Sequence, residues 1–306
     1  MKTLASIDIG SNTVRLLILE AGANGDFREI DSARRITRLG EGMNQGKRLL
    51  PRRMNDTIEV LIQFRDICAK YGNIPVRAVA TSAVREAENK EEFLEKVKEQ
   101  AGFDIEVISW EEEARLTLEG VFWKIPHRNR NILTFDIGGG STEFILSRGR
   151  EIAGFVSTAL GVVRLTEKFI TRHPVVSGEY DRLTAHIQSE LASVKARLSS
   201  FPPQMVIGTA GTVTTLAALE GHIYPYDPGK IHGTVLPFDR IQSIQDDLKA
   251  KSITERLLLK SLEPGREDLI IAGTAIVLET LKTFACSDLV VSEYSLREGI
   301  ILKALR

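Results

Sequence analysis

Two stretches of the sequence decide the fold: DIGSNTVRLLIL, from Asp8 to Leu19, and DIGGGSTEFIL, from Asp136 to Leu146. Each stretch begins with the aspartate that ends an apolar strand. A turn of small residues follows, and then a second apolar strand begins. The second Asp-Ile-Gly stands 128 positions after the first. This internal repeat predicts a duplicated fold in which two loops face each other across a cleft.

Around these stretches, expected strands alternate with expected helices, which is typical of an α/β protein. Strands are expected at residues 4–9, 14–20, up to about 37, 76–80, 105–108, 132–136, 142–147, 151–156 and 205–207. Helices are expected at residues 53–71, 91–100 and from 111 onward.

The segment WKIPHRNRN, residues 123–131, has no periodicity and contains Pro126, so it marks the expected domain boundary. The expected domains are residues 1–123 and 124–306, with a final helix at 295–306 that packs back onto the first domain. The segment Gly221–Gly233 has no regular pattern, so it is expected to be a lid, a binding loop or disordered.

The composition is that of an ordinary globular chain. It has 306 residues, 43% of them hydrophobic, and a formal net charge of −1, which excludes disordered, collagenous and membrane-embedded classes. The near-zero charge also excludes wholesale attraction to nucleic acid. Two cysteines and no apolar leader favour the cytoplasm. From Arg28 to Arg53, eight basic residues oppose three acidic ones, which predicts a solvated basic face or a local anion patch.

Three turns rich in small residues are candidates for binding phosphate through backbone N–H groups, because no Cβ blocks the approach of an anion. Their candidate binding residues are Gly10, Ser11, Asn12 and Thr13; Gly139, Gly140 and Ser141; and Gly208 and Thr212. The third turn follows a strand and opens a helix, where the dipole also favours anions. The alternative for each is an ordinary tight turn. No P-loop or dinucleotide fingerprint is present.

Carboxylates next to these turns would repel a phosphate unless a divalent cation stood between them. Asp8 and Asp136 end the two strands, and Glu143 follows the second turn. One or two carboxylates, completed by substrate oxygens and water, suit Mg²⁺ (or Mn²⁺). Hydrogen bonds from these acids to the turns are the alternative.

Three further residues suggest phosphate chemistry. Glu113 shares a helix face with small and apolar residues, so it is either a base that activates water or part of the acidic first turn of the helix. Arg15 lies in an apolar strand and Arg85 follows a strand, and the guanidinium group pairs well with phosphate oxygens. For Arg85, a surface position on a helix is the alternative.

Other hydrolytic chemistries are disfavoured by the residues present. The histidines show no zinc-ligand spacing, although His232 in the long loop could contact substrate. There is no G-x-S-x-G motif, and Ser141 has no histidine partner nearby in the sequence.

Taken in order, these motifs resemble the exopolyphosphatase / guanosine pentaphosphate phosphohydrolase family of the actin–Hsp70–sugar-kinase superfamily. The similarity also includes TRLGEGMNQGKRL, TSAVREAEN, ISWEEEARLTLEG, STALGVVRLTE, GTAGTVTTLAAL, DPGKIHG and SEYSLREGI. It implies two actin-like (ribonuclease H-like) α/β domains with mixed sheets flanked by helices and a cleft between them. A homodimer is expected, whereas binding to nucleic acid or to a membrane is not.

The resemblance also implies residue roles. Glu113 would be the general base, Asp136 and Glu143 would hold the metal, and Arg15, Arg85 and the three turns would contact phosphate. Two residues depart from the family pattern. Trp110 replaces a small residue before the acidic run and could alter the cleft wall, and Tyr294-Ser295 replaces a more typical glycine or alanine.

The expected function is therefore hydrolysis of the terminal phosphoanhydride bond of inorganic polyphosphate, of guanosine pentaphosphate, or of both. Two alternatives stay open: an ATP-dependent phosphotransferase on the same fold, and a non-catalytic sensor of these ligands. The resemblance implies a short two-domain form without the C-terminal region of long family members, which leaves the preferred chain length undetermined.

Overall fold

The computed structural model describes residues 2–22, 27–127 and 129–305. It divides into two compact units: unit 1 is Met1–Gly120 with Leu296–Arg306, and unit 2 is Val121–Ser295. The sequence predicts a domain boundary after residue 123, and in the structure the first unit is interrupted after Gly120. The last helix belongs to unit 1.

Unit 1 contains a five-stranded mixed sheet in the order β3-β2-β1-β4-β5. Its strands are β1 (Lys2–Ile9), β2 (Thr13–Ala21), β3 (Phe27–Ile36), β4 (Val76–Ala80) and β5 (Ile105–Val107). Its helices are α1 (Met43–Gly46), α2 (Pro51–Ala69), α3 (Ser82–Glu86), α4 (Lys90–Ala101), α5 (Trp110–Val121) and α13 (Leu296–Ala304).

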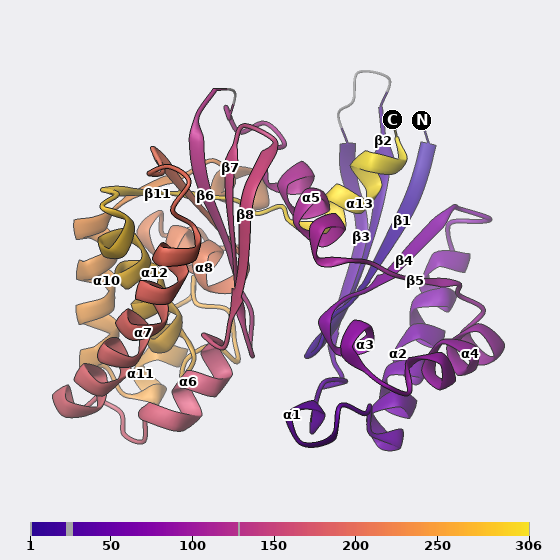
Figure 1. The fold of residues 1–306 in the computed structure, drawn as a ribbon, viewed down its shortest axis with the longest axis horizontal. Coiled ribbons are helices and arrows are strands. Elements are labelled where there is room, and N and C mark those ends of the chain that lie inside the picture. The colour runs from indigo at the N-terminus through magenta and orange to yellow at the C-terminus, as the bar shows by residue number, and fades with distance from the viewer. Residues whose placement is uncertain (1, 23–26, 128, 306) are drawn as a thin grey trace. The chain divides into compact units, whose positions relative to one another are not determined.

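Both faces of this sheet are buried. Alternate residues of β2 point to opposite faces, so Leu16 packs in the core that includes α2 and α4, whereas Leu17 packs in a smaller cluster with Ile301 of α13. Figure 1 shows these helices on the two sides of the sheet. Gly299 of α13 approaches α5 so closely that a Cβ there would lie 1.7 Å from the Leu116 carbonyl oxygen.

Unit 2 contains a six-stranded mixed sheet in the order β10-β11-β9-β6-β7-β8. Its strands are β6 (Asn131–Ile137), β7 (Thr142–Arg148), β8 (Glu151–Thr158), β9 (Met205–Thr209), β10 (Val235–Pro237) and β11 (Asp288–Val291). Its helices are α6 (Val162–Phe169), α7 (Ser177–Arg197), α8 (Gly211–Glu220), α9 (Pro228–Ile231), α10 (Phe238–Ala250), α11 (Ile253–Leu257) and α12 (Ile270–Phe284). The labelled helices of unit 2 gather on one side of its sheet in Figure 1.

The two sheets repeat one topology. In each, two antiparallel pairs (β1–β2 and β2–β3; β6–β7 and β7–β8) are followed by two parallel neighbours, β4 and β5 in unit 1 and β9 and β11 in unit 2. The duplication expected from the repeated Asp-Ile-Gly is therefore confirmed at the level of strand order. Unit 2 adds β10 at one edge.

A fully buried arginine fixes the helical layer of unit 2. Arg256 donates to the carbonyl oxygens of Leu248, Lys251 and Glu267 and to Nδ1 of His173, at 2.8–2.9 Å. Burial and the neighbouring Arg256 both lower the pKa of His173, so the neutral imidazole is the form that accepts this hydrogen bond.

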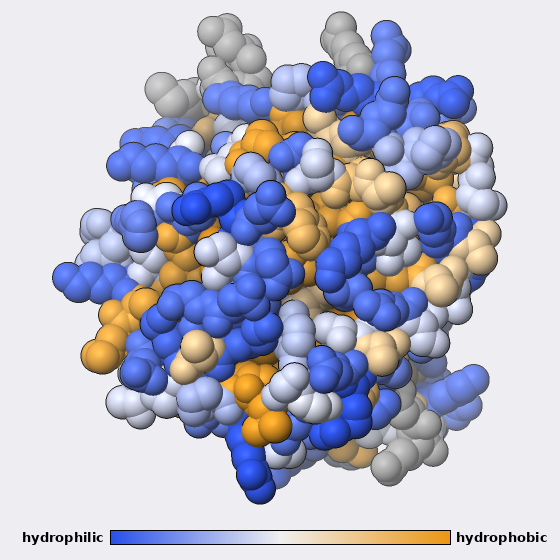
Figure 2. All heavy atoms as spheres, turned by 90° about the vertical axis from the view of Figure 1, so that its left-hand side faces the viewer, coloured by the Kyte–Doolittle hydropathy of each residue, from blue (hydrophilic) through white to orange (hydrophobic). Residues whose placement is uncertain are grey.

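The surface agrees with the composition. Hydrophilic side chains cover most of the face shown in Figure 2, with apolar side chains between them. Among the described residues, no helix combines the length and the apolar character that crossing a bilayer would require.

Candidate active site

The first phosphate turn joins β1 to β2. The Gly10 N–H donates to the carbonyl oxygen of Thr13 at 3.0 Å, and a Cβ on Gly10 would lie 3.2 Å from that oxygen. Asp8 lies directly opposite Arg15 in the β1–β2 register, and Arg15 lies opposite Arg34 of β3. One carboxylate and two guanidinium groups thus stand in a row on one face of the sheet.

The second turn repeats this geometry in unit 2. The Gly138 N–H donates to the carbonyl oxygen of Ser141 at 2.9 Å, and a Cβ on Gly138 would again lie 3.2 Å from the acceptor. Asp136 lies opposite Glu143, at the positions that Asp8 and Arg15 hold in unit 1. The duplicated hairpins therefore carry different charges: a carboxylate with a guanidinium in one, two carboxylates in the other.

Serine hydroxyls hold the two carboxylates of unit 2. Ser295 Oγ donates to Asp136 Oδ2 at 2.9 Å, while the hydroxyls of Ser141 and Ser157 donate to Glu143 Oε1 at 2.7 and 2.9 Å. No group of three or more potential ligands from histidine, cysteine, aspartate and glutamate occurs among the described residues. A pair of oriented carboxylates still fits Mg²⁺, which takes its remaining ligands from water and phosphate oxygens.

Close packing against the second turn requires a glycine at position 161, just before α6. A Cβ on Gly161 would lie 2.2 Å from the carbonyl carbon of Gly140. The carbonyl oxygens of Gly138 and Gly139 accept from Val162 and Val163 at the start of α6, at 3.1 and 3.0 Å. Within the described part of the chain, no backbone acceptor is found for the N–H groups of Gly139 and Gly140, which is the arrangement of an anion-binding turn.

Glu113 and Arg85 form a sheltered ion pair in unit 1. Arg85 Nη1 donates to Glu113 Oε2 at 2.8 Å and to the Ile108 carbonyl oxygen at 2.9 Å, and the two charged side chains are 13% and 16% exposed. The Trp110 ring lies 3.5 Å from Arg85 Cζ. Arg85 Nε and Nη2 are buried and have no hydrogen-bond partner among the residues that the structure describes. Two guanidinium donors therefore remain available to an anionic ligand, beneath an indole ring.

The other two acids of the run, Glu111 and Glu112, have structural roles in the first turn of the helix, which is the alternative that the sequence left open. The Glu112 N–H donates to Ser109 Oγ at 3.2 Å, so Ser109 caps the start of the helix, and the Glu112 carboxylate pairs with Lys303. Hydrogen bonds to its own backbone N–H and to Ser109 lower the pKa of Glu111. Glu113, in contrast, forms its ion pair with the sheltered Arg85 side chain.

The third turn shows a different reason for its glycine. Gly208 lies inside β9, where a Cβ would come 2.7 Å from the Phe135 ring, and Thr212 packs on Gly273 of α12. Ala210 has φ 73°, a left-handed value, at the start of α8. The Arg266 guanidinium covers Gly211, because a Cβ there would lie 1.9 Å from Arg266 Nη2. The Arg266 cation thus lies at this turn. Packing alone already explains why Gly208 and Thr212, the two residues predicted to bind phosphate, occupy their positions.

Comparison with known proteins agrees with this architecture. A family model described as the Ppx/GppA phosphatase family matches residues 17–306. The chain belongs to the Ppx/GppA phosphatase family. It is 31% identical to exopolyphosphatase 2 of Mycobacterium tuberculosis, over 98% of this chain and 97% of that protein. It is 35% identical to a bifunctional 3-dehydroquinate synthase/phosphatase of Fusobacterium nucleatum, of which it spans 46%.

Solved structures support the same family. The Ppx/GppA family member of Aquifex aeolicus aligns over 99% of this chain and 97% of its own, with a TM-score of 0.86 and 37% identity. An exopolyphosphatase of Cytophaga hutchinsonii aligns over 99% and 98%, with a TM-score of 0.85 and 27% identity. The expected fold class, two actin-like α/β domains with mixed sheets, is confirmed, as is membership of this family of hydrolases.

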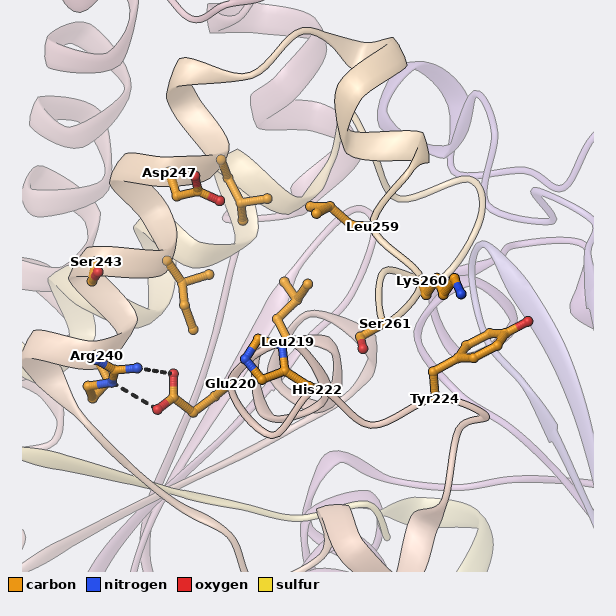
Figure 3. Close-up of a pocket in the computed structure, with 12 residues that line it drawn as sticks. Leu219, Glu220, His222, Tyr224, Arg240, Ser243, Asp247, Leu259, Lys260 and Ser261 are labelled. Carbon is orange, nitrogen blue, oxygen red and sulfur yellow. Dashed lines mark hydrogen bonds and ion pairs between the residues drawn. The ribbon is translucent and has the colours of Figure 1, made fainter.

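The segment 221–233 of this Ppx/GppA member is ordered. It contains α9 and lines a pocket of about 470 Å³ in unit 2 with His222 and Tyr224 (Figure 3). Glu220 and Arg240 form a bidentate ion pair at its wall. None of the predicted site residues lines this pocket.

His232 from the same segment has structural partners. Its Nε2 lies 2.6 Å from the Trp123 carbonyl oxygen, and its ring centroid lies 4.6 Å from that of Tyr294. Burial lowers the pKa of His232. Burial and Glu293 raise the pKa of Tyr226, which donates its hydroxyl to Glu293.

Three contacts at the site escaped sequence reasoning: the Trp110 ring on Arg85, and the hydroxyls of Ser157 and Ser295 on the two carboxylates. Ser157 could have been found, because β8 pairs it with Glu143. The predicted residues are brought together within each unit, Asp8 with Arg15, Arg85 with Glu113, and Asp136 with Glu143 and Ser141. Asp8 belongs to unit 1, whereas Asp136 and Glu143 belong to unit 2, and the metal role of Asp8 stays a prediction.

Proposed function

We propose that this protein hydrolyses the terminal phosphoanhydride bond of inorganic polyphosphate. The observation that carries the proposal is the pair of duplicated hairpins with different charges, Asp8 with Arg15 in one and Asp136 with Glu143 in the other. Relatives named exopolyphosphatase, similar over nearly their whole length, support it. The same chemistry would act on the terminal phosphate of guanosine pentaphosphate, which is the second substrate to be tested.

In unit 1, Glu113 is the proposed base that accepts a proton from the attacking water. Arg85 now pairs with Glu113 at 2.8 Å. A phosphate that engages Arg85 Nε and Nη2 would compensate two unpartnered donors and draw the guanidinium away from the carboxylate. Arg15 would pair with phosphate oxygens as charge spreads over the transferred group, since phosphoryl transfer depends mainly on positioning and electrostatics.

In unit 2, Asp136 and Glu143 are the residues that would hold Mg²⁺ or Mn²⁺. When bound, the cation would neutralise the negative charge of the phosphate oxygens and polarise them. The hydroxyls of Ser141, Ser157 and Ser295 orient the two carboxylates. The N–H groups of Gly139 and Gly140 would bind an anionic oxygen at the same turn.

Initial rates of phosphate release test the proposal. Tripolyphosphate, long-chain polyphosphate and guanosine pentaphosphate are compared with Mg²⁺ and with a chelator. We expect metal-dependent phosphate release from at least the first two. Binding without release would favour a sensor, and transfer of a labelled terminal phosphate to an acceptor would favour a phosphotransferase; either result overturns the proposal. The cytoplasmic location and the homodimer stay predictions.

A further inference from the structure

Unit 1 carries a dense group of exposed basic side chains. Between residues 34 and 52 the sequence has six basic residues and one acid, Glu41. Glu41 is paired with Arg53, just outside that range. The exposed basic residues, which we call the basic surface, are Arg34, Arg35, Arg38, Lys47, Arg48 and Arg52. They come from β3, from the turns around α1 and from the start of α2 (Figure 1).

The basic surface is joined to the first phosphate turn by backbone hydrogen bonds. The N–H groups of Thr37 and Arg38 both donate to the Asn12 carbonyl oxygen at 3.1 Å, and the Gly40 N–H donates to that of Ser11 at 2.7 Å. A Cβ on Gly40 would lie 3.0 Å from Ser11 Cβ. Because Arg34 also faces Arg15 across β2 and β3, the basic surface begins at the turn itself.

Three of these cations occupy positions that local structure disfavours. Arg38 and Lys47 have φ 52° and 47°, in the left-handed region that glycine or asparagine fills more readily. Arg52 stands in the first turn of α2, where the helix dipole favours acids rather than bases. Local stability therefore does not explain these charges, whereas attraction of an anion does.

The acids nearby compensate only part of the positive charge of the basic surface. Glu92 pairs with Lys96, and Arg48 contributes only a smaller part of the lowering of the Glu92 pKa. Glu88 is exposed beside Lys47, whose carbonyl oxygen accepts from the Glu88 N–H at 2.8 Å. A balance of several positive charges remains.

We propose that the basic surface binds the part of a polyphosphate chain that extends beyond the reacting end, so that affinity rises with chain length. The inference rests on the proposed function and adds a second binding segment to it. Linked contacts of this kind raise the affinity for a long ligand without changing the chemistry at its end. Nucleic acid fits less well, because residues 34–52 include no aromatic side chain on which a base could stack.

The test removes three charges in one variant, Arg35→Gln with Lys47→Asn and Arg52→Gln. Asparagine at position 47 tolerates the left-handed backbone. The matched control, Arg65→Gln with Lys70→Gln and Lys98→Gln, removes three exposed cations of the same unit. Lys70 follows the far end of α2, about 27 Å along the helix from Arg52, and Arg65 contacts the C-terminal end of α4.

We expect the basic-surface variant to raise KM for long-chain polyphosphate about tenfold at low ionic strength, less at high salt, with kcat unchanged. The rate with tripolyphosphate and all rates of the control should stay within about twofold of the original. An equal KM in the variant, or an equal loss in the control, overturns the inference while polyphosphate hydrolysis stands. Absence of hydrolysis by the original protein would instead refute the proposed function. Competition by single-stranded DNA as strong as by long polyphosphate would overturn the choice of ligand.

Discussion

The substitution Glu113→Gln separates the proposed chemistry from the fold. A well-placed general base contributes typically about 10²–10⁴-fold, so turnover should fall by that factor, or roughly 3–5 kcal/mol in the barrier. The glutamine oxygen can still accept from Arg85 Nη1, which now lies 2.8 Å from Glu113 Oε2. Exchanging a charged acceptor for a neutral one should lower the free energy of unfolding by only about 1 kcal/mol.

Two further variants make this prediction strict. Glu112→Gln changes the preceding acid of the same helix, whose partner is Lys303, and should leave turnover unchanged. Glu113→Ala leaves the sheltered Arg85 guanidinium without its carboxylate and should lower the free energy of unfolding by about 3–5 kcal/mol. Steady-state rates and chemical denaturation measure both quantities. If Glu113→Gln kept turnover within about threefold, or if Glu112→Gln lost as much, the assignment of the base would be wrong.

Three other outcomes follow from the structure. Trp110→Ser removes the ring that covers Arg85, so we expect the free energy of unfolding to fall by about 1 kcal/mol. Because the guanidinium is then uncovered, the KM for tripolyphosphate should also fall. An unchanged KM would show that the ring moves aside without cost. Ser295→Ala removes the hydroxyl that donates to Asp136 and should raise the Mg²⁺ concentration for half-maximal activity roughly tenfold, whereas an unaltered Mg²⁺ titration would contradict the metal assignment. Because the pKa of His173 is lowered in the folded chain, the unfolded chain binds more protons below about pH 6.5, and the free energy of unfolding should fall as pH drops from 7.5 to 5.5. In thermal unfolding, His173→Gln should remove part of this dependence of stability on pH. An equal dependence in both proteins would exclude this histidine as its source.

The strands and turns could be predicted because their signals are local. The period-two pattern and the aspartate-glycine turn lie within a dozen residues, and β4 was predicted at its observed bounds, Val76–Ala80. Helix α2 was predicted at residues 53–71 and observed at Pro51–Ala69, a shift of two residues at each end. The earlier start reflects Pro51, which occupies the first turn of the helix outside the apolar periodic face.

The side-chain partners could not be predicted, because they join distant parts of the chain. Ser295 reaches Asp136 from a segment that follows the last strand of the sheet, and Arg85 meets Glu113 only because α3 and α5 follow neighbouring parallel strands. Arg256 is hydrophilic by every local criterion, yet it is fully buried. Its burial depends on carbonyl oxygens at the ends of other segments, which no periodicity reveals.

The return of α13 to unit 1 has a consequence for synthesis of the chain. Unit 2 is one continuous stretch, whereas unit 1 needs residues from both sides of it. Until Ile301 arrives, Leu4, Leu17 and Leu19 lack part of their cover. During synthesis, residues 1–120 therefore cannot complete their core before α13 is made, whereas unit 2, which precedes α13 in the chain, can fold earlier.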